Sequence, residues 1–286
     1  MISVVGHLVA YFGNEPENLP CALFSARTAL SSRGHRDGSP AEGFGLGFVQ
    51  GGDVLLRKQP RAETAGVDLY ALAKDTRAEA LVGRVGFPRD GSTLAEDADP
   101  FRFRSWLFGS VGRIDEVAFE SIRDRVLEST PAFLRRNIRG HSPSEHLFHL
   151  FLAFLHDAGT LDQPTPTPAA VNAALQNSLA FVDRLLIASN ASPTDVAIAA
   201  TNGRCFVATS HGHPLRYLQV EGISDCPVCQ AANDHSNGRV GRRIPHEALR
   251  AVVIEADRAV ASRAGWTDLP DRASLIAGPD RVAQVL

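Results

Sequence analysis

The stretch MISVVGHLVAYFG (residues 1–13) has the sequence pattern that first indicates the fold of this chain. Its large apolar residues, among them Val5, Leu8 and Val9, are separated by only a few small or polar residues, which predicts a short buried strand. The second residue, Ile2, is apolar and β-branched, and its side chain has no nucleophilic atom. The strand therefore begins with a residue suited to a protein core.

The composition is that of an ordinary globular protein. The chain has 286 residues, of which 44% are hydrophobic and 21% charged, so it can bury a sizeable core. The net charge of −3 gives no general attraction to nucleic acid or to an anionic membrane. No apolar run approaches the roughly 18 residues of a membrane span, and the N-terminal residues lack the features of a signal peptide. Four cysteines are too few for a disulfide scaffold, so we expect a cytoplasmic protein.

Strand patterns precede and follow a block of helical patterns. Strands are expected at 43–50, 54–59, 79–87, 102–114, within 196–220, at 251–256 and at 273–278, and helices at 116–128, 144–157 and 169–188. The glycines of GFGLGFVQ (43–50) indicate a close backbone approach or a bulge, and the GGD turn predicts a hairpin with the following strand. This order predicts an α+β sandwich with helices outside stacked sheets, in one domain over 1–286 with a candidate loop or metal insertion at 222–245.

The helix near residue 144 has a well-marked start. Ser142 and Glu145 fit a capping box, and Pro143 occupies the first helical position, where its missing N–H costs nothing. The many apolar residues that follow cover a wide face. We therefore expect this helix to pack between layers.

Seven segments, taken in order, resemble the class II glutamine amidotransferases, and in particular the stand-alone branch that includes the ergothioneine-pathway glutaminases. The segments are MISVVGHL (1–8), EGFGLGF (42–48), LVGRVGFP (81–88), EDADPF (96–101), WLFGSVGRID (106–115), RGHSPSEHLFHLFL (139–152) and GWTDLPDRASLIAG (265–278). The order and spacing carry the resemblance, because no single segment is specific. It implies the N-terminal-nucleophile hydrolase fold, a four-layer αββα sandwich.

The same resemblance implies that the glutaminase chemistry has been lost. In this family an N-terminal Cys attacks the amide, an Asn and a Gly stabilise the oxyanion, an Arg pairs with the substrate carboxylate, and an acidic residue holds its ammonium group. This sequence has Ile2 at the nucleophile position, Val111 beside a retained Gly112 at the oxyanion positions, Gly86 at the Arg position and Pro143 at the acidic position. No catalytic residue is therefore assigned.

The leading hypothesis is a catalytically inactive amidotransferase-like protein that binds, scaffolds or regulates as a subunit of a complex, with a protein partner or a second copy of itself. The alternative is an active amidotransferase or hydrolase with a non-standard nucleophile. Ser3 is the nearest hydroxyl, and two residues would have to be removed to expose it. Because Ile2 is too large for the usual removal of the initiator methionine, we expect Met1 to be retained.

A small polar or anionic ligand is a further candidate at the same end of the fold. Arg84 precedes Gly86 by two residues, so the two lie on one side of a strand. Asp97 and Asp99 match facing loop positions of the family, and Gly112 completes the candidate ligand-binding set. A plain salt bridge between Arg84 and one aspartate is the structural alternative.

The segment DCPVCQAANDHSNGR (225–239) holds a Cys-x-x-Cys pair, which is half of a typical zinc site. Cys226, Cys229 and His235 are candidate zinc ligands, and zinc is the only cofactor that the sequence suggests. His211, His213 and Cys205 are candidates for the fourth ligand. Bare loop cysteines and a redox pair are the alternatives, although the pair lacks the strand-to-helix context of a thioredoxin-like motif.

Overall fold

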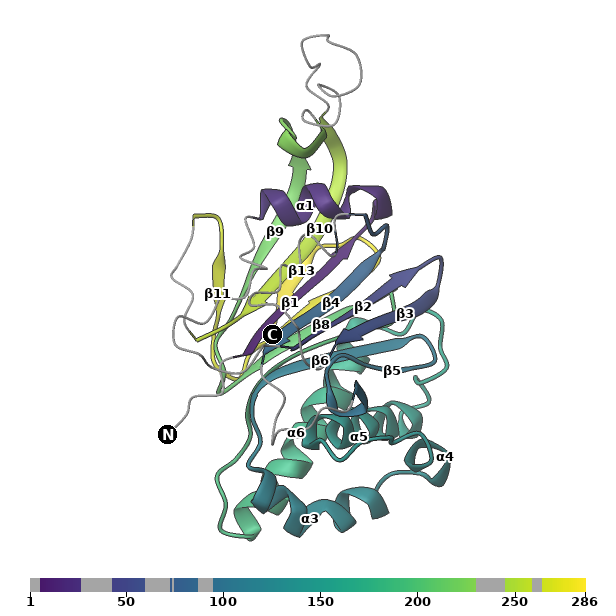
Figure 1. Cartoon of the computed structure of the whole chain (residues 1–286), viewed down its shortest axis with the longest axis vertical. Helices are drawn as coiled ribbons and strands as arrows, with labels where there is room; N and C mark the ends of the chain where they lie inside the picture. The colour runs from purple at the N-terminus through teal and green to yellow at the C-terminus, as the bar shows by residue number, and fades with distance from the viewer. Residues whose placement is uncertain are drawn as a thin grey trace.

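The computed structural model describes residues 6–26, 43–59, 73, 75–86, 95–229, 245–258 and 264–286. Its thirteen described strands form two antiparallel sheets that lie face to face, with helices on both outer sides (Figure 1). The layers are therefore helix, sheet, sheet and helix, as the sequence predicts.

The larger sheet has seven strands in the order β11-β9-β10-β1-β4-β2-β3. Its strands are β1 (Gly6–Gly13), β2 (Gly43–Gln50), β3 (Asp53–Gln59), β4 (Ala80–Gly86), β9 (Leu215–Ile223), β10 (His246–Ala256) and β11 (Thr267–Leu269). The smaller sheet has six strands in the order β13-β12-β8-β7-β6-β5. Its strands are β5 (Phe101–Phe103), β6 (Trp106–Arg113), β7 (Asp195–Thr201), β8 (Phe206–His211), β12 (Ser274–Ala277) and β13 (Ala283–Val285).

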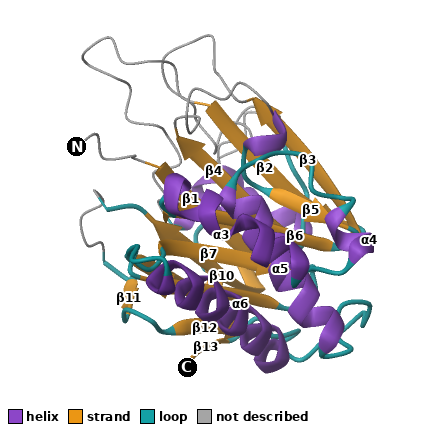
Figure 2. Ribbon diagram, turned by 90° about the horizontal axis from the view of Figure 1, so that it is seen from below, coloured by secondary structure: helices purple, strands orange, loops and turns teal. Residues whose placement is uncertain are grey.

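Within the described part of the chain, the helices divide unequally between the two outer faces. Helices α3 (Glu116–Glu128), α5 (Pro143–Asp157) and α6 (Pro168–Ala188) cover the smaller sheet, with the short α4 (Ala132–Arg135) beside them (Figure 2). The seven-residue α1 (Leu19–Ser25) packs on the larger sheet across β9 and β10. The 3-10 helices are η1 (Pro16–Asn18) and η3 (Ala95–Asp97).

Three apolar layers follow from the period-two alternation of the strands. On β1, Leu8, Ala10 and Phe12 face the smaller sheet, whereas Val9 and Tyr11 face α1. The third layer joins the smaller sheet to α3, α5 and α6 and contains the fully buried Trp106. Because both faces of each sheet are covered, the central strands are buried along their whole length.

The predicted close backbone approach is found at the inner face of β2. A β-carbon at Gly45 would lie 1.9 Å from the backbone oxygen of Asp99, and one at Gly47 would lie 2.4 Å from Leu107 Cδ1. No side chain fits at Gly45 unless the backbone of the facing segment moves. The glycines of this strand therefore set how near the 99–100 segment can come to the larger sheet.

Most predicted elements are confirmed, including the β2–β3 hairpin, the three long helices and the hairpin at Asn202-Gly203. The single strand predicted at 102–114 is wrong, because the chain turns back on itself between Phe103 and Trp106. Arg104 has φ 51°, a left-handed conformation that extended strands do not contain. The chain then changes sheet between β8 and β9, where Gly212 has φ 81°.

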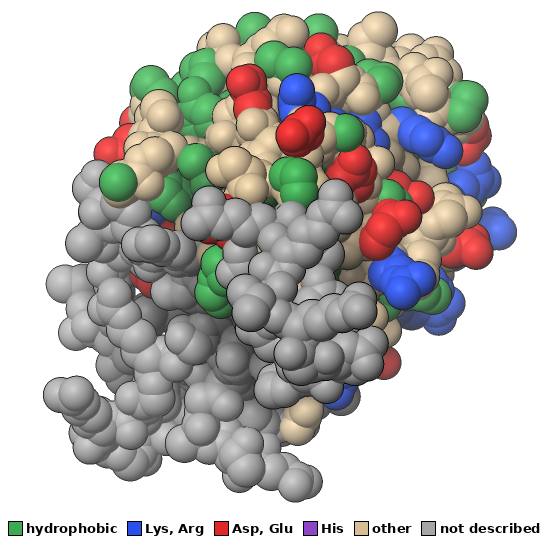
Figure 3. Space-filling view, turned by 90° about the horizontal axis from the view of Figure 1, so that it is seen from above, with side chains coloured by type: hydrophobic (Ala, Val, Ile, Leu, Met, Phe, Trp, Pro, Cys, Tyr) green, Lys and Arg blue, Asp and Glu red, His purple; other side chains and the backbone are tan. Residues whose placement is uncertain are grey.

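No helix among the described residues is long and apolar enough to cross a membrane. Acidic and basic side chains both occur on the described part of the face shown in Figure 3. This mixture agrees with the small net charge of −3.

Replacing Gly45 by alanine should lower the free energy of unfolding by about 1–3 kcal/mol, because the new methyl group overlaps the Asp99 carbonyl. The matched control is Gly278→Ala, whose β-carbon would meet its nearest atom at 3.6 Å. That variant should be neutral or slightly stabilised. Urea unfolding of both variants measures the difference, and equal stabilities would contradict the close approach.

Candidate functional site

Three glycines lie side by side at one end of the larger sheet. Gly86 of β4 pairs with Gly6 of β1 on one side and with Gly43 of β2 on the other. Arg84, two residues earlier on β4, lies on the same inner face as Gly86. At this end, three neighbouring strands therefore expose only their backbone to the space between the sheets.

Two side chains from elsewhere occupy the space beside Gly6. A β-carbon at Gly6 would lie 2.8 Å from Val111 Cγ2 and 3.3 Å from Arg84 Nη2. Val111 comes from β6 of the facing sheet and is 1% exposed, and Arg84 is 8% exposed. The structure thus brings Arg84, Gly86 and Val111 together, while Ile2 lies outside the described residues.

Arg84 has an acidic neighbour in the facing loop. Its Nε lies 3.9 Å from Asp99 Oδ2, and both residues are buried. The other oxygen, Asp99 Oδ1, accepts hydrogen bonds from the backbone N–H and the hydroxyl of Ser110. Asp99 therefore couples β4 to β6 through one carboxylate.

Asp97 has a different task, since its Oδ1 accepts hydrogen bonds from the backbone N–H groups of His141 and Ser142. The predicted capping box is consequently only half formed. Ser142 accepts from the Glu145 N–H as expected, but the Glu145 carboxylate accepts from Arg139 and Gly140. Because Asp97 already takes the Ser142 N–H, Glu145 binds the preceding turn, and the two acids together fix the start of α5.

Gly112 and Pro143 are both placed by backbone requirements. Gly112 has φ 114°, and a β-carbon there would lie 2.2 Å from the Asp195 backbone oxygen, so only glycine fits. Pro143 is buried at the first turn of α5, after the N-cap Ser142. It offers no charge to a ligand.

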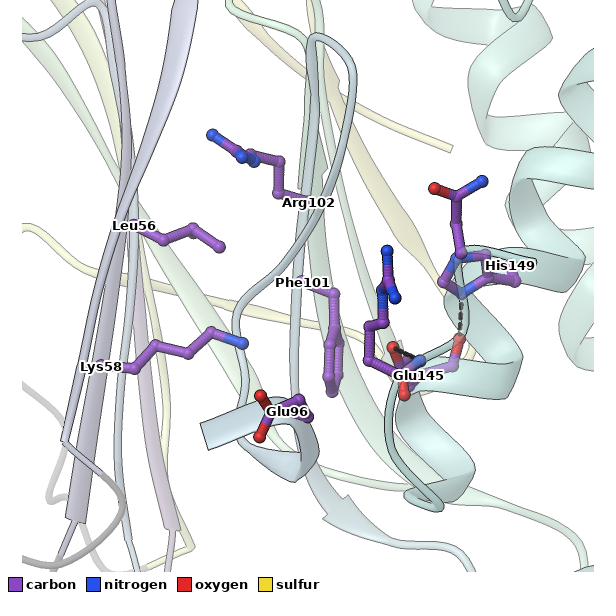
Figure 4. A pocket seen from close by; sticks show the side chains of 9 residues that line it. Leu56, Lys58, Glu96, Phe101, Arg102, Glu145 and His149 are labelled. Atoms are coloured by element: carbon purple, nitrogen blue, oxygen red, sulfur yellow. Dashed lines mark hydrogen bonds between the residues drawn. The ribbon is translucent and has the colours of Figure 1, made fainter. Parts of the chain in front are cut away.

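A cavity of about 270 Å³ lies between β3, β5 and the start of α5 (Figure 4). It is lined by Leu56, Lys58, Glu96, Phe101, Arg102, Asn137, Arg139, Glu145 and His149. In Figure 4 the Lys58 side chain extends from its strand toward Glu96, and Glu145 and His149 lie on the opposite side. The Lys58 ammonium lies 5.0 Å from the centre of the Phe101 ring, a cation–π contact.

Burial alters the ionisable groups of this cavity. It lowers the pKa of Lys58, although several carboxylates nearby act in the opposite direction, and it raises the pKa of Glu145. It also lowers the pKa of His149 to about 4. The ring nitrogen His149 Nδ1 lies 2.9 Å from the Glu145 carbonyl and so donates to it, which leaves Nε2 as an acceptor. This Nε2 is buried at the cavity and has no hydrogen-bond partner among the described residues.

This cavity was not predicted from the sequence, although one signal for it was present. Val54, Leu56 and Lys58 alternate on β3 and share its inner face, so a lysine follows two apolar residues toward the interior. A buried lysine needs acidic partners. The carboxylates near Lys58 come from Asp99, from Glu145 of α5 and from η3, all far away in the sequence, and the pattern of β3 cannot name them.

A second group of side chains lies where α1 packs on the β9–β10 end of the larger sheet. The ligand atoms of Cys21, Cys226, Cys229 and His246 all lie within 4.8 Å of one another. Burial raises the pKa of the Cys21 and Cys229 thiols. The two cysteines of the Cys-x-x-Cys pair thus meet Cys21 and His246, which the sequence analysis did not propose.

The other proposed metal ligands do not belong to this group. Cys205 lies in the layer between the smaller sheet and its helices, with its thiol 3.5 Å from Asn202 Oδ1. His211 pairs with Asp183 at 2.7 Å, and His213 Nδ1 lies 3.7 Å from Asp195 Oδ1. The candidate fourth ligands Cys205, His211 and His213 were therefore wrong, because they lie at the two ends of β8, which belongs to the opposite sheet. His235 lies outside the described residues.

Comparison with solved structures decides the fold. A glutamine aminotransferase class-II domain protein from Silicibacter pomeroyi superposes with a TM-score of 0.58 at 15% identity, over 98% of both chains. The fold is that of a class II glutamine amidotransferase domain. A predicted glutamine amidotransferase from Pseudomonas aeruginosa gives a TM-score of 0.53 at 13% identity, over 99% of both chains.

The glutamine phosphoribosylpyrophosphate amidotransferase of B. subtilis gives a TM-score of 0.52 at 13% identity. The match covers 98% of this chain and 48% of that longer one, so the amidotransferase-like fold corresponds to one part of that enzyme. No protein-family model matches the sequence, and no curated protein matches it.

The low pKa of His149 predicts an acid-sensitive stability. As the pH falls from 6.5 to 4, the unfolded chain binds a proton at this histidine and the folded protein does not, so stability is lost across that window. The contribution is up to about 3 kcal/mol. In His149→Gln, which keeps a donor and cannot titrate, the free energy of unfolding should fall less steeply between pH 6.5 and 4. The exposed His156→Gln serves as control and should follow the wild type in urea titrations.

Proposed function

We propose that this chain is a catalytically inactive amidotransferase-like protein, one domain over 1–286, that binds, scaffolds or regulates as a subunit of a complex. The observation that carries the proposal is the packing of Val111 and Arg84 against Gly6. The resemblance assigns an oxyanion donor to position 111, where an apolar side chain now fills the inner face. It assigns the nucleophile to Ile2 and the carboxylate clamp to Gly86.

The proposed loss affects several catalytic groups that act together. Removing one oxyanion donor typically lowers the catalytic rate by about 10²–10³-fold, and without a nucleophile that donor has nothing to stabilise. Gly86 cannot pair with a carboxylate, and Pro143 cannot hold an ammonium group. The competing hypothesis, an active amidotransferase or hydrolase with a non-standard nucleophile such as Ser3, requires that this packed end still admit a substrate.

The compartment that fits best is the cytoplasm. Cys21, Cys205, Cys226 and Cys229 are all free thiols, three of them buried. Free thiols in this number are typical of a reducing environment.

The purified protein should release no ammonia from glutamine, and Ile2→Cys alone should stay at background. The variant supplies a thiol but leaves Val111, Gly86 and Pro143 in place, and groups that act as a unit are not restored singly. The quadruple variant with Val111→Asn, Gly86→Arg and Pro143→Asp is the positive arm, with circular dichroism to verify folding. If Ile2→Cys alone turned over glutamine at about 1 per second, an ordinary enzymatic rate, the assignment of the other three positions would be contradicted.

The binding role is best supported at the cavity of Figure 4, where a small polar or anionic ligand would meet groups of both signs. Lys58 and Arg139 suit a carboxylate, and the buried His149 Nε2 suits a ligand N–H or O–H group. The earlier candidates serve differently, since Asp97 holds the loop before α5 and Asp99 lies against Arg84.

Glutamate is a suitable probe for this cavity, since it carries two carboxylates and one ammonium group. Calorimetry should detect its binding, and Lys58→Met should weaken it at least about tenfold, equivalent to about 1.4 kcal/mol. The control Arg57→Met changes the neighbouring residue, which faces away from the cavity on the exposed side of β3. Equal affinity in both variants would remove Lys58 from the site.

A second candidate function is that of a metal-binding module through Cys226 and Cys229. The specific observation in its favour is that two further ligand residues lie within 4.8 Å of these thiols. Elemental analysis of the purified protein tests this candidate, which is independent of the lost glutaminase chemistry.

A further inference from the structure

We propose that Cys21, Cys226, Cys229 and His246 hold one structural Zn²⁺ that fastens α1 to the β9–β10 end of the larger sheet. This inference rests on the metal-binding candidate and deepens it, since it names the complete ligand set and its purpose. The ligands come from three separate places: α1, the segment 226–229 after β9, and the first residue of β10. Cys21 and Cys229 are 208 positions apart in the sequence.

Two distances within this group match edges of a zinc tetrahedron. Zn–S bonds of about 2.3 Å and Zn–N bonds of about 2.0–2.1 Å place two sulfurs about 3.8 Å apart, and a sulfur and a nitrogen about 3.5 Å apart. Cys21 Sγ lies 3.6 Å from Cys229 Sγ, and Cys229 Sγ lies 3.4 Å from His246 Nε2. A central ion can therefore reach these atoms without a large rearrangement of the chain.

The chemistry of the donors selects the metal. Three thiols and one imidazole suit zinc, whereas magnesium and calcium prefer oxygen ligands. Four protein ligands also complete the coordination of a structural site and leave no open position for a substrate. The spacing of Cys226 and Cys229 is that of one arm of such a site, and Cys226 is 1% exposed.

The position of Cys21 on α1 indicates what a bound ion would stabilise, namely the attachment of this helix to the sheet. Helix α1 has only seven residues, and the Asn18 side chain donates to Glu15 instead of capping it. A helix this short is not stable by itself in water. Its C-terminal end is held by a hydrogen bond of 3.1 Å from Trp266 Nε1 to the Ala26 carbonyl. A zinc ion bound to Cys21 would fix the middle of the helix to the same sheet.

Elemental analysis of full-length protein, purified without a metal-affinity step, should give about one zinc per chain. Cys21→Ser should lower the zinc content at least about tenfold. The matched control is Cys205→Ser, which also changes a buried free cysteine but one outside the group, and which should keep one zinc. His246→Gln gives a second test of the ligand set should Cys21→Ser fail to fold.

The outcomes separate the two claims. Wild-type protein without zinc, with its cysteines freely titratable or joined in a disulfide, overturns both the metal-binding candidate and this inference. Zinc that is lost in Cys226→Ser and Cys229→Ser but kept at one per chain in Cys21→Ser and His246→Gln overturns only the ligand set proposed here.

The fastening of α1 has its own measurement. When a chelator removes zinc from the wild-type protein, amide hydrogen exchange over residues 19–26 should accelerate at least about tenfold, while α6 (Pro168–Ala188) should stay protected. Fluorescence gives a parallel signal through Trp266, and it should vanish in Trp266→Phe. Unchanged exchange in α1 after zinc removal would overturn the structural role.

Discussion

The close packing of the two sheets is the constraint on which the rest of this structure depends. Between them lie small side chains such as Ala10, Ala197 and Ala199, together with glycines that admit the neighbouring chain. A sandwich packed this tightly leaves little room for a change in side-chain volume on its inner faces. An inner residue at the end of a strand is therefore either part of a site or part of the packing. Val111 and Gly6 are part of the packing, so the proposed loss of amidotransferase chemistry is compatible with an intact fold.

The same tight packing explains how the buried charges are arranged. A charge between the layers must be paired, because removing one member of a buried pair typically costs about 3–5 kcal/mol. Asp99, between the sheets, is shared between Arg84 and the Ser110 hydroxyl and backbone. On the outer face of the larger sheet, Glu255 meets both His7 and Arg216. Lys58 lies at the open edge of the sandwich beside a cavity, with the carboxylates of Glu96, Asp99 and Glu145 near it. The edge strand β3 is thus where this fold can best accommodate a charged group that a ligand could meet.

Period-two alternation and turn residues were enough to predict most of the elements, because those signals are local. The turn at Arg104 was missed because nothing in its immediate sequence favours a left-handed residue over a continuing strand. The candidate site likewise contains residues that could be brought together from the sequence and residues that could not. Arg84, Gly86 and Val111 could be brought together because the resemblance supplied the topology. His246 could not be placed beside Cys226, because that requires knowing how β9 and β10 pair, and Cys21 requires knowing where α1 crosses them.

The two outer layers of this sandwich differ in how they can be held in place. Helices α5 and α6 have 15 and 21 residues and bury many large apolar side chains against the smaller sheet, so burial alone can hold them. Helix α1 buries five residues, of which only Leu19 and Leu23 carry large aliphatic side chains. With so little apolar area, an added cross-link stabilises the layer more than further packing could, as small domains commonly show with metals. A zinc ion at Cys21 would therefore supply to α1 what the long helices obtain from burial, and the metal would then be a part of the fold.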